Sequence, residues 1–124
     1  MTLLKLLYYP YSMNYKIKSR IWIEHENHVL LGEGRVLLLK AIDKTGSLSK
    51  AAKSLNISYK KAWDLIDSVN KSAKTPVTKN SIGGKGGGGA QLTEYGKSLV
   101  TVFDEINQNC WEFLDLQLEK IKQL

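Results

Sequence analysis

Three helical segments in quick succession between Gly34 and Asn70 constrain the fold of this chain more than any other part of its sequence. The first segment is an apolar run that ends at Thr45-Gly46-Ser47, where a glycine can take the positive φ of a helix C-terminus. The second covers only residues 49–55, with Ser47 or Ser49 as its N-cap and two adjacent alanines that allow another helix to approach closely. Because so short a helix is not stable alone, it must pack against its neighbours.

A second break, at Asn56-Ile57-Ser58, leads into a longer amphipathic helix. Asparagine readily adopts the left-handed conformation, and Ser58 is suited to cap the helix that follows. The apolar face of that helix consists of Ala62, Leu65 or Ile66, and Val69. Two helices joined by a short turn, the second with lysines in its first turn, are typical of a helix-turn-helix. A plain three-helix core explains the apolar spacing equally well, so the flanking segments must decide.

Positive charge is concentrated in the part of the chain that contains this pattern. The formal net charge is +6. Residues 14–92 carry fourteen lysines and arginines against six acidic residues, whereas residues 93–124 carry three against six. A solvated basic surface needs no ligand to explain it, but this asymmetry favours a polyanionic partner such as nucleic acid.

The residue types that catalytic and metal sites need are scarce or badly spaced in this sequence. Cys110 is the only cysteine, which excludes an intramolecular disulfide and a cysteine-based zinc cluster and fits the reducing cytoplasm. His25 and His28 flank an expected turn and are interpreted as exposed loop residues rather than metal ligands. The glycine run contains a G-x-G-x-x-G match, but no βαβ unit surrounds it. We therefore expect neither an enzyme nor a cofactor site.

The N-terminal segment consists of an apolar stretch and an alternating one. Residues 1–12 are too short to span a membrane and lack the features of a secretory signal. We expect them to be an optional extension if translation starts at Met13, or an apolar arm that packs on the domain or on a partner. Residues 15–24 alternate apolar and polar side chains, which predicts a strand. Residues 25–28 would form the turn and residues 29–31 the returning strand, before a break at Gly32-Glu33-Gly34.

A second hairpin with a glycine-rich tip is expected after the third helix. Residues 77–82 and 90–92 are the predicted strands, and the seven residues from Gly83 to Gly89 include six glycines. Glycine loses the most conformational freedom on ordering, so we expect a mobile tip that carries one cation, Lys85.

A long helix is predicted from its N-cap, Thr93, to the end of the chain. At 1.5 Å per residue, about thirty residues would reach roughly 45 Å, more than a small domain can cover. We therefore expect the apolar stripe of this helix to form a homodimer interface, and folding back onto residues 1–12 is the alternative. The stripe consists of Leu99, Phe103, Ile106, Cys110, Phe113 or Leu114, Leu118 and Ile121, with Cys110 as a small buried apolar residue.

The order of these elements and three motifs resemble one protein family. A hairpin, three helices, a glycine-tipped hairpin and a long terminal helix make up a winged helix-turn-helix. From about Tyr15 onward, the segments SYKKAWD, GGKGGGGA and LTEYG together resemble the N-terminal DNA-binding domain of the ModE-type molybdate-responsive transcription regulators. The resemblance implies a homodimer that binds palindromic duplex DNA. The sequence stops where that family continues into oxyanion-binding modules, so we expect no direct binding of molybdate.

These interpretations combine into one expected architecture and function. The fold class is mainly α with small β elements, in three parts: an N-terminal extension (1–13), a winged helix-turn-helix (14–92) and a C-terminal dimerisation helix (93–124). We expect a cytoplasmic, sequence-specific regulator of transcription that places its third helix in the major groove of double-stranded DNA and its glycine-tipped hairpin, the wing, on the backbone or in the minor groove. It would not associate with membranes. A protein-interaction module is the alternative. The expected DNA-binding residues are Ser47, Ser49, Lys50, Ser58, Tyr59, Lys60, Lys61, Lys85 and Gly86.

Overall fold

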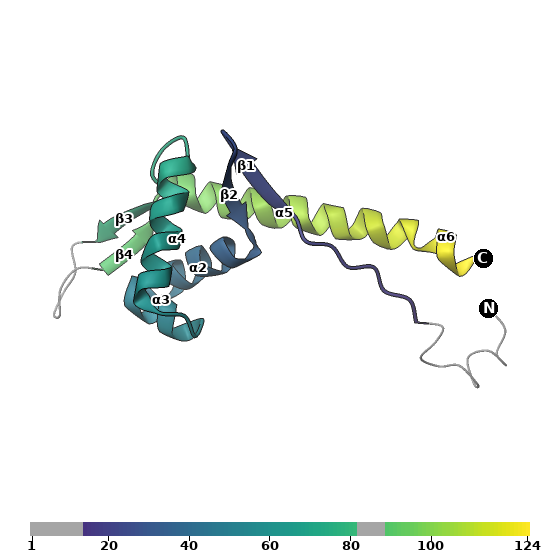
Figure 1. Cartoon of the computed structure of the whole chain (residues 1–124), viewed down its shortest axis with the longest axis horizontal. Coiled ribbons are helices and arrows are strands. Elements are labelled where there is room, and N and C mark those ends of the chain that lie inside the picture. Colours follow the sequence, from purple (N-terminus) through teal and green to yellow (C-terminus); the bar gives the residue numbers. More distant parts are fainter. Residues whose placement is uncertain (1–13, 82–88) are drawn as a thin grey trace. The chain divides into compact units, whose positions relative to one another are not determined.

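Helices dominate the chain, and two short hairpins accompany them (Figure 1). The computed structural model describes residues 14–81 and 89–124. The elements are β1 (Trp22–His25), β2 (His28–Gly32), α2 (Glu33–Thr45), α3 (Leu48–Ser54), α4 (Tyr59–Ser72), β3 (Thr78–Ser81), β4 (Gly89–Leu92), α5 (Glu94–Gln117) and α6 (Glu119–Lys122). One compact unit is Arg20–Glu105, and a second contains Ile106–Leu124. The predicted class, a mainly helical winged helix with small β elements, is confirmed.

The first hairpin is shorter than the alternating sequence suggested. β1 and β2 pair antiparallel around Glu26-Asn27, whose φ angles of 52° and 67° match the tight two-residue turn of a hairpin. The prediction of a strand is wrong for residues 15–21. The returning strand ends at Gly32, where α2 begins, so residues before Trp22 have no strand to pair with. An alternating pattern alone does not make a strand when the hydrogen-bonding partner is absent.

A bulge in this hairpin brings two consecutive leucines into the core. Ile23 lies opposite Leu31, whereas Glu24 lies opposite Val29, so Leu30 is the extra residue on β2. In a regular strand, neighbouring side chains point to opposite faces. The bulge changes that alternation, and both Leu30 and Leu31 are buried.

The break between α2 and α3 follows the sequence closely. Gly46 ends α2 with a φ of 71°, and its N–H donates to the Ile42 carbonyl at 2.8 Å. Of the two candidate caps for α3, Ser47 is the one used: its side-chain oxygen accepts from the Lys50 N–H at 3.1 Å. The sequence predicts a break at Gly32-Glu33-Gly34, but only Gly32 lies outside the helix, because α2 begins at Glu33.

The break between α3 and α4 has the predicted chemistry as well. Asn56 adopts a φ of 58°, in the left-handed region. Ser58 caps α4 by accepting from the Lys61 N–H at 3.0 Å. These two breaks set the directions of α3 and α4 and so determine which side chains face outward.

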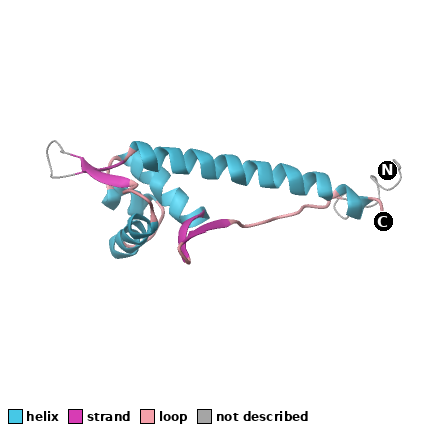
Figure 2. Cartoon of the chain, turned by 90° about the horizontal axis from the view of Figure 1, so that it is seen from above, coloured by secondary structure: helices cyan, strands magenta, loops and turns pink. Residues whose placement is uncertain are grey.

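One hydrophobic core joins the elements of the Arg20–Glu105 unit, where the strands form two separate hairpins beside the helices (Figure 2). Helix α2 is central and packs against α3, α4, β2 and β4. Of the two residues predicted as alternatives for the apolar face of α4, Ile66 is buried and Leu65 is half-buried. The buried members are Leu30, Leu31, Val36, Leu38, Leu39, Ile42, Ala51, Ala52, Ala62, Ile66, Val69, Val77, Leu92, Val100 and Phe103.

The C-terminal helix begins as predicted but does not run unbroken to the end of the chain. The side-chain oxygen of Thr93 accepts from the Gly96 N–H at 2.9 Å and so caps α5. Helix α5 has 24 residues, or about 36 Å of helix rather than 45 Å. After Leu118 the chain continues as the four-residue α6, where hydrogen bonds such as Ile121 N–H to Leu118 C=O have the tighter i to i+3 spacing.

Within residues 14–81 and 89–124, no helix is both long and apolar enough to cross a membrane.

Candidate nucleic-acid interface

The expected DNA-binding residues in the described ranges lie at the starts of α3 and α4. Ser47, as the cap of α3, is half-buried. The other six are exposed: Ser49, Lys50, Ser58, Tyr59, Lys60 and Lys61. Exposed caps and first turns leave these side chains accessible to a ligand that approaches the two helices from outside.

The side chains of α4 are sorted by helical geometry into a buried face, an outer face and two flanks. Successive residues are about 100° apart around the axis. Since Ala62 and Val69 are buried, this spacing puts Lys60 on the outer face. Tyr59 and Trp63, four residues apart, lie on one flank, and Lys61 lies on the other. A surface that meets the outer face of α4 would therefore contact Lys60 first, with an aromatic pair on one side and a second cation on the other.

Lys60 already has an acidic neighbour on its own helix. Its ammonium lies 3.2 Å from the Asp64 carboxylate, and the side chains are 83% and 50% exposed. An exposed i,i+4 ion pair contributes only a few tenths of a kcal/mol. A phosphate could therefore replace Asp64 as the partner of Lys60 at small cost. Lys61 has no ion pair within the described parts of the chain.

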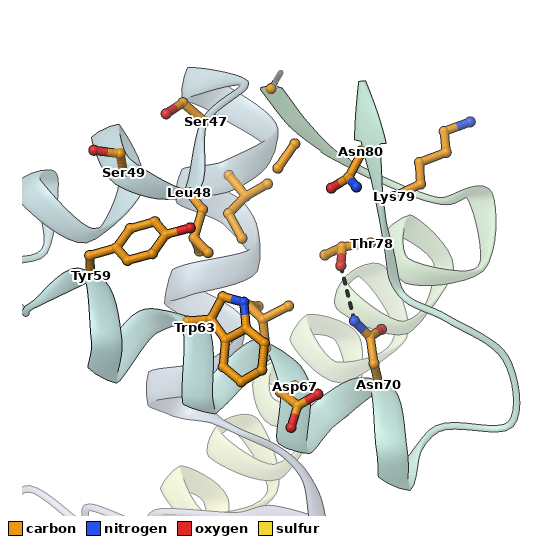
Figure 3. Close-up of a pocket in the computed structure, with 14 residues that line it drawn as sticks. Ser47, Leu48, Ser49, Tyr59, Trp63, Asp67, Asn70, Thr78, Lys79 and Asn80 are labelled. Carbon is orange, nitrogen blue, oxygen red and sulfur yellow. Dashed lines mark hydrogen bonds between the residues drawn. The ribbon is translucent and has the colours of Figure 1, made fainter. Parts of the chain in front are cut away.

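A groove of about 540 Å³ lies between α4 and the β3–β4 hairpin (Figure 3). Tyr59 and Trp63 line it from α4, and Thr78 and Asn80 line it from β3. Both aromatic side chains remain well exposed, Tyr59 at 56% and Trp63 at 50%. The described residues that line it are Ile42, Ser47, Leu48, Ser49, Tyr59, Trp63, Ile66, Asp67, Asn70, Thr78, Lys79, Asn80, Gly89 and Ala90. The groove thus has aromatic, hydroxyl and amide groups on facing walls.

Asn70 holds the two walls of the groove together. Its side-chain oxygen accepts from the Val77 N–H at 2.7 Å, and its amide nitrogen donates to the Thr78 hydroxyl at 3.1 Å (Figure 3). On the other strand of the wing, the Ala90 N–H donates to the Gly46 carbonyl at 3.0 Å. The hairpin is therefore attached both to the end of α4 and to the turn before α3, which gives the groove a defined width.

Among the described residues that line the groove, the one acidic side chain is neutralised locally. Asp67 lies 2.8 Å from the ammonium of Lys71, four residues further along α4. The hydrogen bond from Lys71 to Asp67, and then the negative charge of Asp67, raise the pKa of Lys71 above its usual value. Because Lys71 is charged at neutral pH, Asp67 adds little net negative charge to the groove.

Comparison with known proteins identifies the family. The chain is 35% identical to the molybdenum transport protein ModE of Azotobacter vinelandii over 106 residues, which is 86% of the chain and 39% of that protein. It is 49% identical to the transcriptional regulator ModE of Yersinia pestis over 70 residues, 56% of the chain and 27% of that protein. The chain contains a ModE-type domain. A third relative, the DNA-binding transcriptional dual regulator ModE of Escherichia coli, is 43% identical over 64% of the chain and 32% of its own length.

The similarity covers only part of these relatives. The chain spans about a third of the length of the curated ModE proteins that it matches. No protein-family model matches it. The predicted resemblance to ModE-type regulators is nevertheless confirmed by these relatives.

The ModE-type domain brings three of the predicted DNA-binding residues together around the groove. Ser47, Ser49 and Tyr59 all line it. Lys50, Ser58, Lys60 and Lys61 lie outside this lining, on the exposed first turns of α3 and α4. Lys85 and Gly86, predicted for the wing tip, lie outside the described residues.

The predicted dimer stripe on the C-terminal helix has a mixed environment. Phe103 is 3% exposed in the core of the domain, and Leu99 packs against that core. Cys110 and Leu114 are half-buried, whereas Ile106 and Ile121 are 44% and 47% exposed. Phe103 is therefore already used by the chain's own core and cannot give much surface to a partner.

Trp63, Asn70, Thr78 and Asn80 also line the groove but are not among the predicted DNA-binding residues. Trp63 could have been found, because it falls four residues after Tyr59 and off the apolar face of α4. Thr78 and Asn80 alternate with Lys79 along β3, but no local pattern shows which face of that strand meets α4. Nothing in the sequence around Asn70 indicates its two bonds to the wing, because those bonds depend on the folded arrangement.

The two histidines lie at the predicted hairpin turn, and one of them bonds to the end of α4. His25 and His28 are exposed and opposite each other in the register. The Nδ1 atom of His25 donates to the carbonyl of Ser72 at the end of α4. Within residues 14–81 and 89–124, no group of three or more histidine, cysteine or acidic side chains is arranged to bind a metal ion.

Proposed function

We propose that this chain is a transcription regulator that binds double-stranded DNA through α4 and the wing. In this proposal α4 is the recognition helix and enters the major groove with its first turn foremost. The β3–β4 hairpin contacts the backbone or the adjacent minor groove. The starts of α3 and α4 contribute phosphate contacts from Ser49, Lys50 and Lys61.

The exposed first turn of α4 in a ModE-type domain is the observation that carries this proposal. Lys60 and Lys61 are exposed there, and only Lys60 has an acidic neighbour among the described residues. The relatives from Yersinia pestis and Escherichia coli are named as transcriptional regulators, and the latter as DNA-binding. The excess of basic residues over residues 14–92 is suited to phosphate.

We further propose that the chain acts as a homodimer through residues 106–124. Ile106, Phe113 and Leu116 are 44%, 59% and 72% exposed on α5. Together with the exposed Asn109, they have the alternating spacing of three and four residues that is typical of a coiled-coil seam. A single asparagine at such a seam is known to specify register and oligomeric state. This seam replaces part of the predicted stripe, since Phe103 is buried in the chain's own core.

Selection of bound sequences from random duplex DNA, followed by affinity measurements at several salt concentrations, tests the proposed function. We expect one enriched two-fold symmetric sequence and an affinity that falls steeply with salt, because each neutralised phosphate releases a counterion. The half-sites should be one helical turn, or a multiple of it, apart. Failure to enrich any sequence, with salt-independent binding to other proteins, would instead favour the protein-interaction module.

A further inference from the structure

We propose that the groove between α4 and β3 holds the sugar–phosphate backbone of one DNA strand. This inference rests on the proposed function. In B-form DNA a single backbone strand separates the major groove from the neighbouring minor groove. If α4 lies in the major groove and the wing reaches the minor groove, that strand must pass through the space between α4 and the wing. The groove of about 540 Å³ occupies this space.

The walls of the groove match the alternating chemistry of such a strand. A DNA strand alternates phosphates, which accept hydrogen bonds, with deoxyribose rings, which expose mainly carbon. The Tyr59 hydroxyl on α4 and the Asn80 amide on β3 are donors on opposite walls (Figure 3). On the same wall as Tyr59, the Trp63 ring is 50% exposed. Packing of Trp63 against a deoxyribose would remove apolar surface from water.

The charges around the groove favour an anionic occupant of this kind. The acidic group in the lining, Asp67, is paired with Lys71 at 2.8 Å. Lys79, Ser47 and Ser49 border the groove, but the Lys79 ammonium and the two serine hydroxyls point away from the space between Tyr59 and Asn80 (Figure 3). A phosphate in the groove therefore meets donors from α4 and β3 and a carboxylate that already has a cation.

Two substitutions distinguish the proposed contact with phosphate from the proposed contact with deoxyribose. Tyr59→Phe removes only the hydroxyl, so affinity for the selected duplex should fall roughly tenfold to a hundredfold, the usual effect of one hydrogen bond to a charged group. Trp63→Ala removes the aromatic surface and should weaken binding to all duplexes. It should leave the salt dependence unchanged, because contact with a sugar releases no counterion. Trp22→Ala is the matched control: Trp22 is 56% exposed and does not line the groove, so affinity should stay at the wild-type value.

Replacing single phosphates of the selected duplex by uncharged methylphosphonates locates the strand. For the wild type, we expect one or two neighbouring phosphates on one strand of each half-site to be sensitive. For Tyr59→Phe, the penalty at one of these positions should shrink, because the donor that contacts it is gone. Circular dichroism of each variant checks that the fold is retained.

The results distinguish a failure of the proposed function from a failure of the inference about the groove. Wild-type protein that binds no duplex would contradict the proposed function itself. Wild-type protein that binds a selected duplex, together with Tyr59→Phe and Trp63→Ala variants of unchanged affinity, would overturn only the inference about the groove. An identical methylphosphonate profile for wild type and Tyr59→Phe would also overturn it.

Discussion

Gly96 occupies a position that no other residue can fill without moving the backbone. A Cβ atom built on Gly96 would overlap the carbonyl oxygen of Val77 and lie 3.0 Å from its carbonyl carbon. Val77 cannot easily retreat, because its N–H is bound by Asn70 at 2.7 Å and its carbonyl accepts from the Thr93 N–H at 2.9 Å. Substitution of Gly96 by alanine should therefore strain the joint between α4, β3 and α5.

The expected magnitude combines two opposing contributions. Overpacking of this kind costs about 1–3 kcal/mol, and a weakened hydrogen bond to Val77 adds about 1 kcal/mol. Alanine regains about 1 kcal/mol relative to glycine inside a helix. Gly96→Ala should thus lower the free energy of unfolding by about 1–3 kcal/mol.

Gly34→Ala is the matched control for this substitution. Gly34 also lies in a helix, α2, but its Cβ would meet no atom within 4 Å. Only the helix-propensity gain applies, so this variant should be more stable than the wild type by about 0.5–1 kcal/mol.

Urea unfolding followed by circular dichroism measures both effects. The two variants should shift the midpoint in opposite directions with little change in slope. Because the joint positions the wing, Gly96→Ala should also weaken DNA binding, whereas Gly34→Ala should not. A Gly96→Ala protein as stable as the wild type would refute the argument, since it would mean that Val77 can move away without penalty.

Further predictions concern the DNA contacts, the dimer, the groove and molybdate. Changing both Lys60 and Lys61 to alanine should weaken duplex binding and reduce the slope of log affinity against log salt by about one unit for each phosphate that is no longer neutralised; fluorescence anisotropy with unchanged affinity and slope would show that α4 does not face DNA. Ile106→Asp should yield monomers in sedimentation experiments, because it places a charge in the proposed apolar seam, and a monomeric wild type would contradict the dimer. Asn70→Ala should lower the free energy of unfolding by about 1–3 kcal/mol, since it leaves the Val77 N–H without its partner. An unchanged urea midpoint would contradict the role of Asn70 in holding the wing to α4. Calorimetric titration with molybdate should detect no saturable binding, because an oxyanion site needs several donors held on a rigid frame; micromolar binding that sulfate does not inhibit would refute this.

The helical breaks and the order of the elements could be predicted from local residue chemistry. Gly46 and Asn56 take positive φ as predicted, and Ser47 and Ser58 cap the helices that follow them. These features are local: a cap or a left-handed turn depends on a side chain and the backbone within four residues of it. Local chemistry of this kind can be interpreted without knowledge of the fold.

The extent of the first strand, the members of the groove and the exposed seam of α5 depend instead on contacts between segments that are distant in the sequence. Residues 15–21 alternate like a strand but have no partner, because β2 gives way to α2 at Gly32. Phe103 and Ile106 both fit an apolar stripe, yet one is buried by the chain's own core and the other is exposed. Asn70 gains its role from Val77 and Thr78, which lie after the end of α4, where β3 begins. In each case the outcome depends on which segment lies opposite, and helical or strand periodicity in one segment contains no information about its neighbour.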